Sequence, residues 1–295
     1  ILAQAHSTPA AASAPFSQIE PLAMGACQPA DRQERATSFE KAVQLDPGNP
    51  AAWRNLGLEG GGKVGERIYE KSECFLRALE IDPCFAPAWR NLGLEGGGKV
   101  GERIYEKSEC FLRALEIDPC FAPAWRSLGV AGGGKVGEKT YCRKDCYLMA
   151  LELDPNDANN WSNFGNAGGG SIKGVTYTQQ DCYVRSLELN PNNADAWSNL
   201  GADGGGAIKG TLYTPKDCYV RSLELNPNLA RAWSNFGSAG GGSIKGVTYT
   251  RQDCYVRSLE LDPNGATAWC GLGNAGGGSV KGTTYTEKEC AIRAL

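Results

Sequence analysis

The chain has 295 residues, of which 41% are hydrophobic and 21% charged, the composition of an ordinary globular protein. Its formal net charge of −3 provides no basic surplus for binding nucleic acid or anionic lipid through bulk electrostatics. No segment reaches the ~18 apolar residues that a membrane-spanning helix requires. We therefore expect neither a nucleic-acid partner nor a membrane span.

Residues 1–35 are expected to form an irregular N-terminal extension or linker. Their first 30 residues are rich in Ala, Pro and Ser and show no regular period. They also lack the charged start and continuous apolar run of a signal peptide. The only histidine, His6, lies in this segment. Residues 36–46 (ATSFEKAVQLD) then read as a helix that opens a repeat array over residues 36–295.

The array has a period of 36 residues, which is visible in three residue types at once. All seven tryptophans follow it: Trp53, Trp89, Trp125, Trp161, Trp197, Trp233 and Trp269. So do seven cysteines: Cys74, Cys110, Cys146, Cys182, Cys218, Cys254 and Cys290. The prolines before each new unit keep the same spacing, and residues 52–87 and 88–123 are identical. Such a period predicts a solenoid, because each unit can bury its apolar face only against its neighbours.

Residues 192–227 illustrate the unit. Residues 192–201 are predicted to form a first helix, which ends before Gly204, Gly205 and Gly206 because glycine is a poor helix former. The following residues 207–214 (AIKGTLYT) alternate around a Lys-Gly pair, the pattern of a small β-hairpin. The corresponding pair is x-Gly in repeats four to seven and Gly-x, such as Gly65-Glu66, in repeats one to three. These pairs predict type I′ and type II′ turns respectively.

A second helix follows each hairpin. Thr178 and Asp181 have the spacing of a capping box at its start. The helix is expected to end at the Asn-Pro or Asp-Pro pair, because the residue before proline is disfavoured in the α region. Both ends of the array fall within a second helix, as they do in a fragment of a longer protein. The predicted fold is an all-α solenoid with a small β-hairpin between the two helices of each repeat.

The repeat resembles the tetratricopeptide repeat (TPR) family. The resemblance rests on AWSNLG (residues 196–201) in the first helix and CYVRSLELNP (residues 182–191) in the second, recurring over residues 36–295. The family's period is two residues shorter, and glycines such as Gly60 replace an aromatic residue. Lys71 and Gln179 stand where a small residue is usual, and hairpin tyrosines such as Tyr69 are expected to fill the vacated space. The resemblance implies a right-handed superhelix whose first helices line a concave, protein-binding groove.

Polar residues follow each tryptophan on the face that this resemblance assigns to the groove. The position two residues later holds Asn55, Asn91, Ser127, Asn163, Asn199, Asn235 and Gly271. It resembles the asparagine ladder by which some TPR proteins hold a peptide backbone, since a carboxamide both donates and accepts hydrogen bonds. The position before it holds Arg54, Arg90, Arg126, Ser162, Ser198, Ser234 and Cys270. The predicted groove residues are Arg54, Asn55, Arg90, Asn91, Arg126, Asn163, Asn199 and Asn235.

Two alternatives remain open for these residues: the asparagines bond their own scaffold, and the arginines form a solvated face. Arg54 and Asn91 partly match the carboxylate clamp of chaperone-binding TPR domains. Pro123 and Ser127 occupy places where that clamp needs basic residues, so the clamp is not assigned here.

Other chemistry is not expected. Residues 57–64 approach the P-loop pattern, but Val64 cannot bind Mg²⁺ through a hydroxyl and no buried strand precedes the glycines. The periodic cysteines lie ~10 Å apart in neighbouring helical units, too far for disulfides. They are predicted to be small buried core residues of a protein in a reducing compartment. We expect no catalytic residues, no metal and no cofactor.

The first functional hypothesis is an intracellular, non-enzymatic scaffold, cytoplasmic by preference, that binds segments of other proteins in its groove and takes no small-molecule substrate. One alternative is a permanent structural subunit of a large assembly. Another is the regulatory array of an enzyme whose catalytic domain lies outside these residues. Near-identical units favour the first two, because catalysis requires unlike residues at one place.

Overall fold

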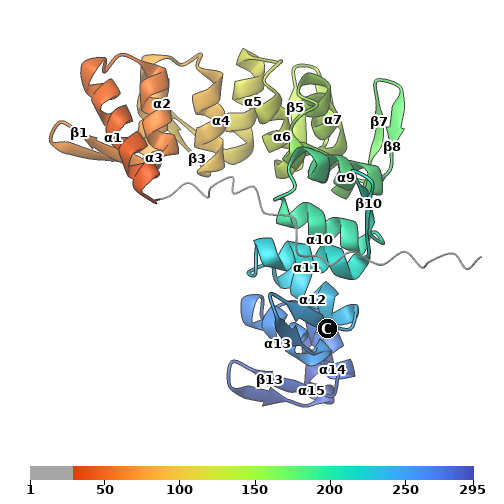
Figure 1. Ribbon diagram of the computed structural model, residues 1–295. Helices are drawn as coiled ribbons and strands as arrows, with labels where there is room; N and C mark the ends of the chain where they lie inside the picture. The colour runs from red at the N-terminus through yellow and green to blue at the C-terminus, as the bar shows by residue number, and fades with distance from the viewer. Residues whose placement is uncertain (1–28) are drawn as a thin grey trace, which may run out of the picture.

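The computed structural model describes residues 29–295, with side chains from Asp31 onward, as a row of packed helix pairs (Figure 1). Helix α1 (Pro29–Leu45) precedes seven pairs within these residues. The first helices of the pairs are α2 (Pro50–Leu58), α4 (Ala86–Leu94), α6 (Ala122–Ala131), α8 (Ala158–Asn166), α10 (Ala194–Ala202), α12 (Ala230–Ser238) and α14 (Ala266–Asn274). The second helices are α3 (Lys71–Ile81), α5 (Lys107–Ile117), α7 (Arg143–Leu153), α9 (Gln179–Leu189), α11 (Pro215–Leu225), α13 (Arg251–Leu261) and α15 (Glu287–Arg293).

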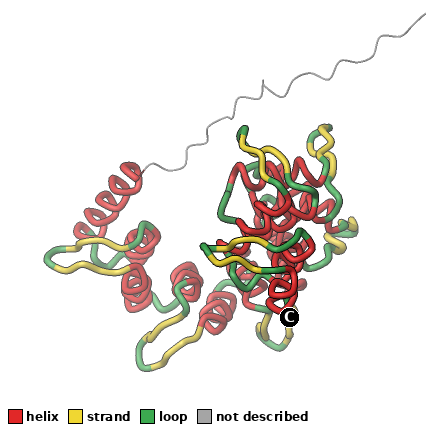
Figure 2. The backbone as a smooth tube through the Cα atoms, turned by 90° about the horizontal axis from the view of Figure 1, so that it is seen from below, coloured by secondary structure: helices red, strands yellow, loops and turns green. Residues whose placement is uncertain are grey.

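An antiparallel two-stranded hairpin joins the two helices of every pair. The strand pairs are β1 (Gly61–Val64) with β2 (Arg67–Glu70), β3 (Gly97–Val100) with β4 (Arg103–Glu106), β5 (Gly133–Val136) with β6 (Lys139–Cys142), β7 (Gly170–Ile172) with β8 (Val175–Tyr177), β9 (Gly206–Ile208) with β10 (Thr211–Tyr213), β11 (Gly242–Ile244) with β12 (Val247–Tyr249), and β13 (Gly278–Val280) with β14 (Thr283–Tyr285). Figure 2 shows the hairpins reaching outward from the helices. The expected solenoid of helix–hairpin–helix units is confirmed.

The hairpin turns follow the two predicted chemistries. In β7–β8, Ile172 pairs with Val175, and the two turn residues Lys173 (φ 48°) and Gly174 (φ 83°) both have positive φ. Two positive φ angles define a type I′ turn. In β1–β2, Val64 pairs with Arg67 and only the first turn residue, Gly65, has positive φ (63°), as a type II′ turn requires. The P-loop-like residues 57–64 are thus the end of a helix and the first strand of a hairpin.

Helix α1 begins at Pro29, which corrects the expected start at residue 36. The Nε atoms of Arg32 and Arg35 donate to the Glu59 backbone oxygen and carboxylate, each at 3.0 Å, and hold α1 against the end of α2. Residues 1–28, which include His6 and most of the predicted linker, lie outside the described residues.

One aromatic contact recurs in every repeat. The tryptophan of the first helix donates its indole N–H to the proline carbonyl six residues earlier, at 2.7–2.9 Å. The same ring meets the hairpin tyrosine edge to face, at centroid distances of 4.6–4.9 Å. Edge-to-face pairs are the favourable geometry for aromatic rings. The tyrosines therefore anchor the hairpins to the core.

The periodic cysteines are core residues. All seven are fully buried, at 0% exposure, and free of disulfides. Burial raises the pKa of six of these thiols to about 12, namely those of Cys74, Cys110, Cys146, Cys182, Cys218 and Cys254. The predicted structural role is confirmed.

The array is not uniform along its length. Successive first helices contact one another along most of the array, and α8 joins the third repeat chiefly through α7. One apolar core runs without a break from Val43 to Ala150, whereas beyond it each core joins the second helix of one repeat to the first helix of the next. Figure 1 shows the row changing direction near α8 and α9. Of the helices in residues 29–295, none combines the length and apolar character needed to cross a membrane.

Candidate peptide-binding groove

The first helices form the inner side of the bent array. They pack on each other from repeat to repeat, while successive second helices make little direct contact. A curved row of helix pairs must be shorter on its concave side, so the closer helices lie there. Each first helix buries its tryptophan on one side. The residues one, two and five positions after the tryptophan therefore lie toward the concave side.

Three neighbouring hollows lie along this side, between α4 and α12. The first, of about 190 Å³, is lined by Arg90, Leu94, Lys107, Phe111, Arg126, Ser127, Val130 and Asn163. The second, of about 230 Å³, is lined by Val130, Arg143, Tyr147, Asn163, Asn166 and Ala167. The third, of about 300 Å³, is lined by Asn159, Ser162, Asn163, Asn166, Asn193, Asp195, Asn199 and Arg231. Asn163 borders all three, so the hollows adjoin one another and form a row, the groove.

The predicted arginines lie in a row, one per repeat, and bond mainly to uncharged groups. The Nη1 atom of Arg54 donates to the Asn55 side-chain oxygen at 3.1 Å. Arg90 donates to the Ser127 hydroxyl at 3.1 Å and to the Asn91 side-chain oxygen at 3.3 Å. Both arginines are partly buried, which lowers the pKa of each guanidinium. For Arg90, the nearby charges of Arg126 and Arg54 lower the pKa further.

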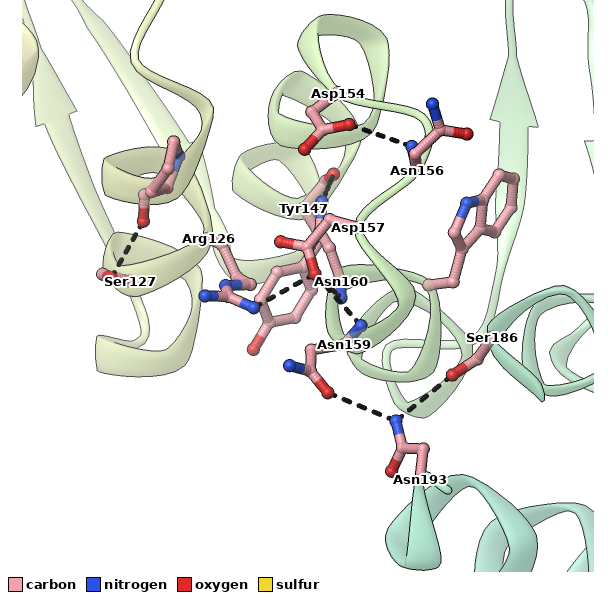
Figure 3. A network of polar contacts seen from close by, with 12 residues as sticks. Arg126, Ser127, Tyr147, Asp154, Asn156, Asp157, Asn159, Asn160, Ser186 and Asn193 are labelled. Carbon is pink, nitrogen blue, oxygen red and sulfur yellow. Dashed lines mark hydrogen bonds and ion pairs between the residues drawn. The ribbon is translucent and has the colours of Figure 1, made fainter. Parts of the chain in front are cut away.

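Arg126 has the one carboxylate partner in this row. Its Nη1 atom lies 3.1 Å from an oxygen of Asp157, and both side chains are about one-fifth exposed. The same Asp157 oxygen accepts the backbone N–H groups of Asn159 and Asn160, and so caps helix α8 (Figure 3). The ion pair therefore connects α6 to the start of α8.

The predicted asparagines differ in how they are placed. Asn91 and Asn199 are buried, with 1% and 6% of their surface exposed. Asn199 donates to the Asn166 side chain at 2.9 Å and accepts from Arg231 at 2.6 Å, so both of its polar atoms bond the scaffold. The side chains of Asn163 and Asn235 are half-buried and make no hydrogen bond to the rest of the described chain. Of these two, Asn163 lies in the groove hollows.

The structure adds residues that the sequence reasoning missed. Asn166 lies at the position that Leu58, Leu94 and Val130 occupy in earlier repeats, and it accepts the Tyr183 hydroxyl at 2.9 Å. Asn193 donates to Asn159 and to Ser186, each at 3.3 Å, across two repeats (Figure 3). A comparison of repeats at the fifth residue after each tryptophan would have found the first of these. The second depends on a contact between helices.

The groove offers hydrogen-bond donors and acceptors, positive charge at one end and apolar side chains between them. No group of three or more His, Cys, Asp or Glu residues able to hold a metal occurs in residues 29–295. What the groove can do chemically is hold a polar, extended ligand.

No protein-family model matches the chain, and no curated protein sequence matches it. Among solved structures, the chain is similar to that described as "Crystal Structure of the Yeast Tom70", with a TM-score of 0.41 and 12% sequence identity. The similarity covers 83% of this chain and 51% of that chain, so this chain spans about half the length of that protein. The proposed function therefore rests on the groove itself.

Proposed function

We propose that this chain is a non-catalytic scaffold of the TPR type that binds extended segments of other proteins in its concave groove. The observation that carries the proposal is the row of three adjoining hollows from α4 to α12, all of which Asn163 borders. A carboxamide in such a place can pair with a peptide N–H and a peptide C=O at once, whatever the peptide's side chains. The row of hollows suits an elongated ligand better than a compact one. The proposal includes the right-handed superhelix of the TPR family.

A displayed library of random peptides tests this function. Peptides selected on the wild-type protein would be measured against Asn163→Trp, which fills the shared wall of the hollows, and against Asn163→Ala. We expect Asn163→Trp to abolish binding and Asn163→Ala to weaken it by about three- to tenfold, the size of one or two lost hydrogen bonds. Leu212→Ser, on an exposed hairpin position, is the control because Leu212 is 76% exposed and far from the hollows' lining.

Peptides that bound both Asn163 variants as tightly as the wild type would refute groove binding. Loss of binding in Leu212→Ser alone would do the same and would move the interaction to the hairpins.

A second candidate function is a permanent subunit of a larger assembly, and the hairpins favour it. Ile68, Ile104 and Leu212 lie on three different hairpins and are 71–76% exposed. Threonine occupies this position in the other repeats, namely at Thr140, Thr176, Thr248 and Thr284. The triple change of these three apolar residues to threonine should release a permanent partner from the purified complex while leaving the fold intact. A complex of unchanged mass would argue against this role.

A further inference from the structure

The first three repeats differ from the later ones on the groove side in a way that the fold does not require. The residue after the tryptophan is Arg54, Arg90 or Arg126 in these repeats and Ser162, Ser198 or Ser234 in the next three. Both versions form the same first helix with the same tryptophan contact. The helix therefore folds with either residue, and the arginines are available for another purpose.

Apolar side chains accompany these arginines one helical turn later. Leu58, Leu94 and Val130 are 43%, 48% and 52% exposed. Residues four apart lie on the same face of a helix, so each arginine has an apolar neighbour beside it. In the next repeats this position is polar or small, namely Asn166, Ala202, Ser238 and Asn274. The combination of exposed apolar side chains and cations is thus confined to the first three repeats.

The first hollow shows how the two kinds of residue are arranged. Leu94, Phe111 and Val130 contribute its apolar lining, and Arg90, Lys107 and Arg126 contribute its cations. The three arginines of this row carry three positive charges. Within residues 29–295, the row makes one ion pair with a carboxylate, that of Arg126 with Asp157. That carboxylate also caps α8, so it is shared. The stretch keeps an excess of positive charge next to apolar surface.

We infer that the groove along α2, α4 and α6 binds an extended protein segment that carries acidic and apolar side chains in alternation. The carboxylates pair with the arginine row, and the apolar side chains enter the hollow between α4 and α6. Equivalent residues of neighbouring repeats lie ~10 Å apart. A segment in the extended polyproline II conformation advances ~3.1 Å per residue with three residues per turn, so acidic side chains at every third residue lie on one face at about this spacing. This inference rests on the proposed function and specifies the partner's chemistry.

A protein segment fits this surface better than a nucleic acid does. Phosphate backbones are bound chiefly by cations, and the apolar residues beside each arginine would contribute nothing to that contact. Guanidinium groups pair well with carboxylates, and partial burial strengthens such pairs relative to those in bulk water. Leu58, Leu94 and Val130 supply the additional apolar contact area.

The test uses a labelled peptide of four Glu-Leu-Ser units and fluorescence anisotropy with the whole chain. We expect saturable binding that weakens as salt is raised, because exposed charge pairs are screened. A Glu-Ser-Ser peptide should bind more weakly, a Lys-Leu-Ser peptide should not bind, and a single-stranded oligonucleotide should not displace the first peptide. The groove variant combines Arg54→Ser, Arg90→Ser and Arg126→Ser, which installs the residue that repeats four to six carry.

This variant should lose at least about tenfold in affinity for the Glu-Leu-Ser peptide. The control variant removes the same charge from second helices through Arg185→Ser, Arg221→Ser and Arg257→Ser, and should keep the wild-type affinity. These three control arginines pair with glutamates three residues on and line none of the three hollows.

Three outcomes would overturn the inference: no binding of the Glu-Leu-Ser peptide, equal loss in both variants, or tighter binding of the Lys-Leu-Ser peptide or the oligonucleotide. The library experiment with Asn163→Trp separates the two ideas. If selected peptides depend on Asn163 but not on the arginines, groove binding stands and the acidic partner does not. If neither change matters, both are wrong.

Discussion

At the residue scale, the periodic cysteines show how a small side chain serves packing while its chemistry is suppressed. Cys182 is fully buried, and desolvation raises the pKa of its thiol to about 12 from the ordinary value of 9.0. Its neighbour Asp181 adds a smaller effect in the same direction, since a nearby negative charge disfavours the thiolate. The same pattern recurs at Cys218 and Cys254. These thiols are neutral in the folded chain at any physiological pH.

This predicts a loss of stability in alkali. The folded thiols ionise near pH 12, whereas those of the unfolded chain ionise near 9.0, so the unfolded state binds fewer protons between these values. The stabilising contribution is complete below pH 9 and declines as the pH rises toward 12. Urea unfolding at pH 7, 9 and 10.5 measures it. The triple variant with Cys182, Cys218 and Cys254 changed to Ala should decline less steeply. Parallel declines would contradict the prediction.

At the element scale, two different turn types close the same hairpin in different repeats. The turn glycine Gly210 has φ 82° and follows Lys209 at φ 48°, the pair of positive angles of a type I′ turn. Nothing lies within 4 Å of a Cβ atom built on Gly210. A substitution there therefore acts through backbone conformation alone. Gly65 lies in the type II′ turn of the β1–β2 hairpin, where only the first turn residue needs positive φ.

Gly210→Ala is accordingly expected to destabilise the chain by roughly 1–2 kcal/mol, the cost of a left-handed conformation for an L-residue with a side chain. Thermal or urea unfolding would measure the change. Thr211→Ala, at the next and exposed position, is the matched control and should change stability by less than about 0.5 kcal/mol. A Gly210→Ala variant as stable as the control would mean that this hairpin has no type I′ turn.

At the scale of the whole molecule, the apolar core is divided unevenly along the array. One core runs through the first three repeats, and each later core is smaller and joins the second helix of one repeat to the first helix of the next. Cooperativity in a repeat protein depends on the interfaces between neighbouring units. The Arg126–Asp157 ion pair links α6 of the first core to the start of α8. The third hollow, of about 300 Å³, follows from α8 to α12 and is lined by polar side chains.

Amide hydrogen exchange should therefore show the first three repeats, through Ala150, opening as one unit, and the residues beyond it opening in smaller units and more often. Mass spectrometry of exchanged peptides would resolve the two regions. Arg126→Ser should raise exchange at the start of α8 and leave α2 to α4 unchanged. Equal protection of all repeats, or an effect of Arg126→Ser that spread evenly along the chain, would contradict this division.

Much of the fold was predictable from the sequence because the signals are local. The 36-residue period, the glycine stop, the two turn chemistries and the Thr178–Asp181 capping box each depend on a few adjacent residues. The start of α1 was not predictable in this way, because its first turns are held by contacts of Arg32 and Arg35 with the distant Glu59.

The groove shows where local signals end. The sequence by itself determined the polar stripe of arginine and asparagine on the first helices, since their spacing from each tryptophan sets the face on which they lie. Only the tertiary structure decided which of them border the hollows without a partner of their own. Asn91 accepts a hydrogen bond from Arg90 and Asn199 accepts one from Arg231 of the next first helix, whereas the Asn163 side chain has no such partner in residues 29–295 and lines all three hollows. The reason is physical: equivalent positions in a repeat acquire different surroundings when the neighbouring residues or repeats present different side chains.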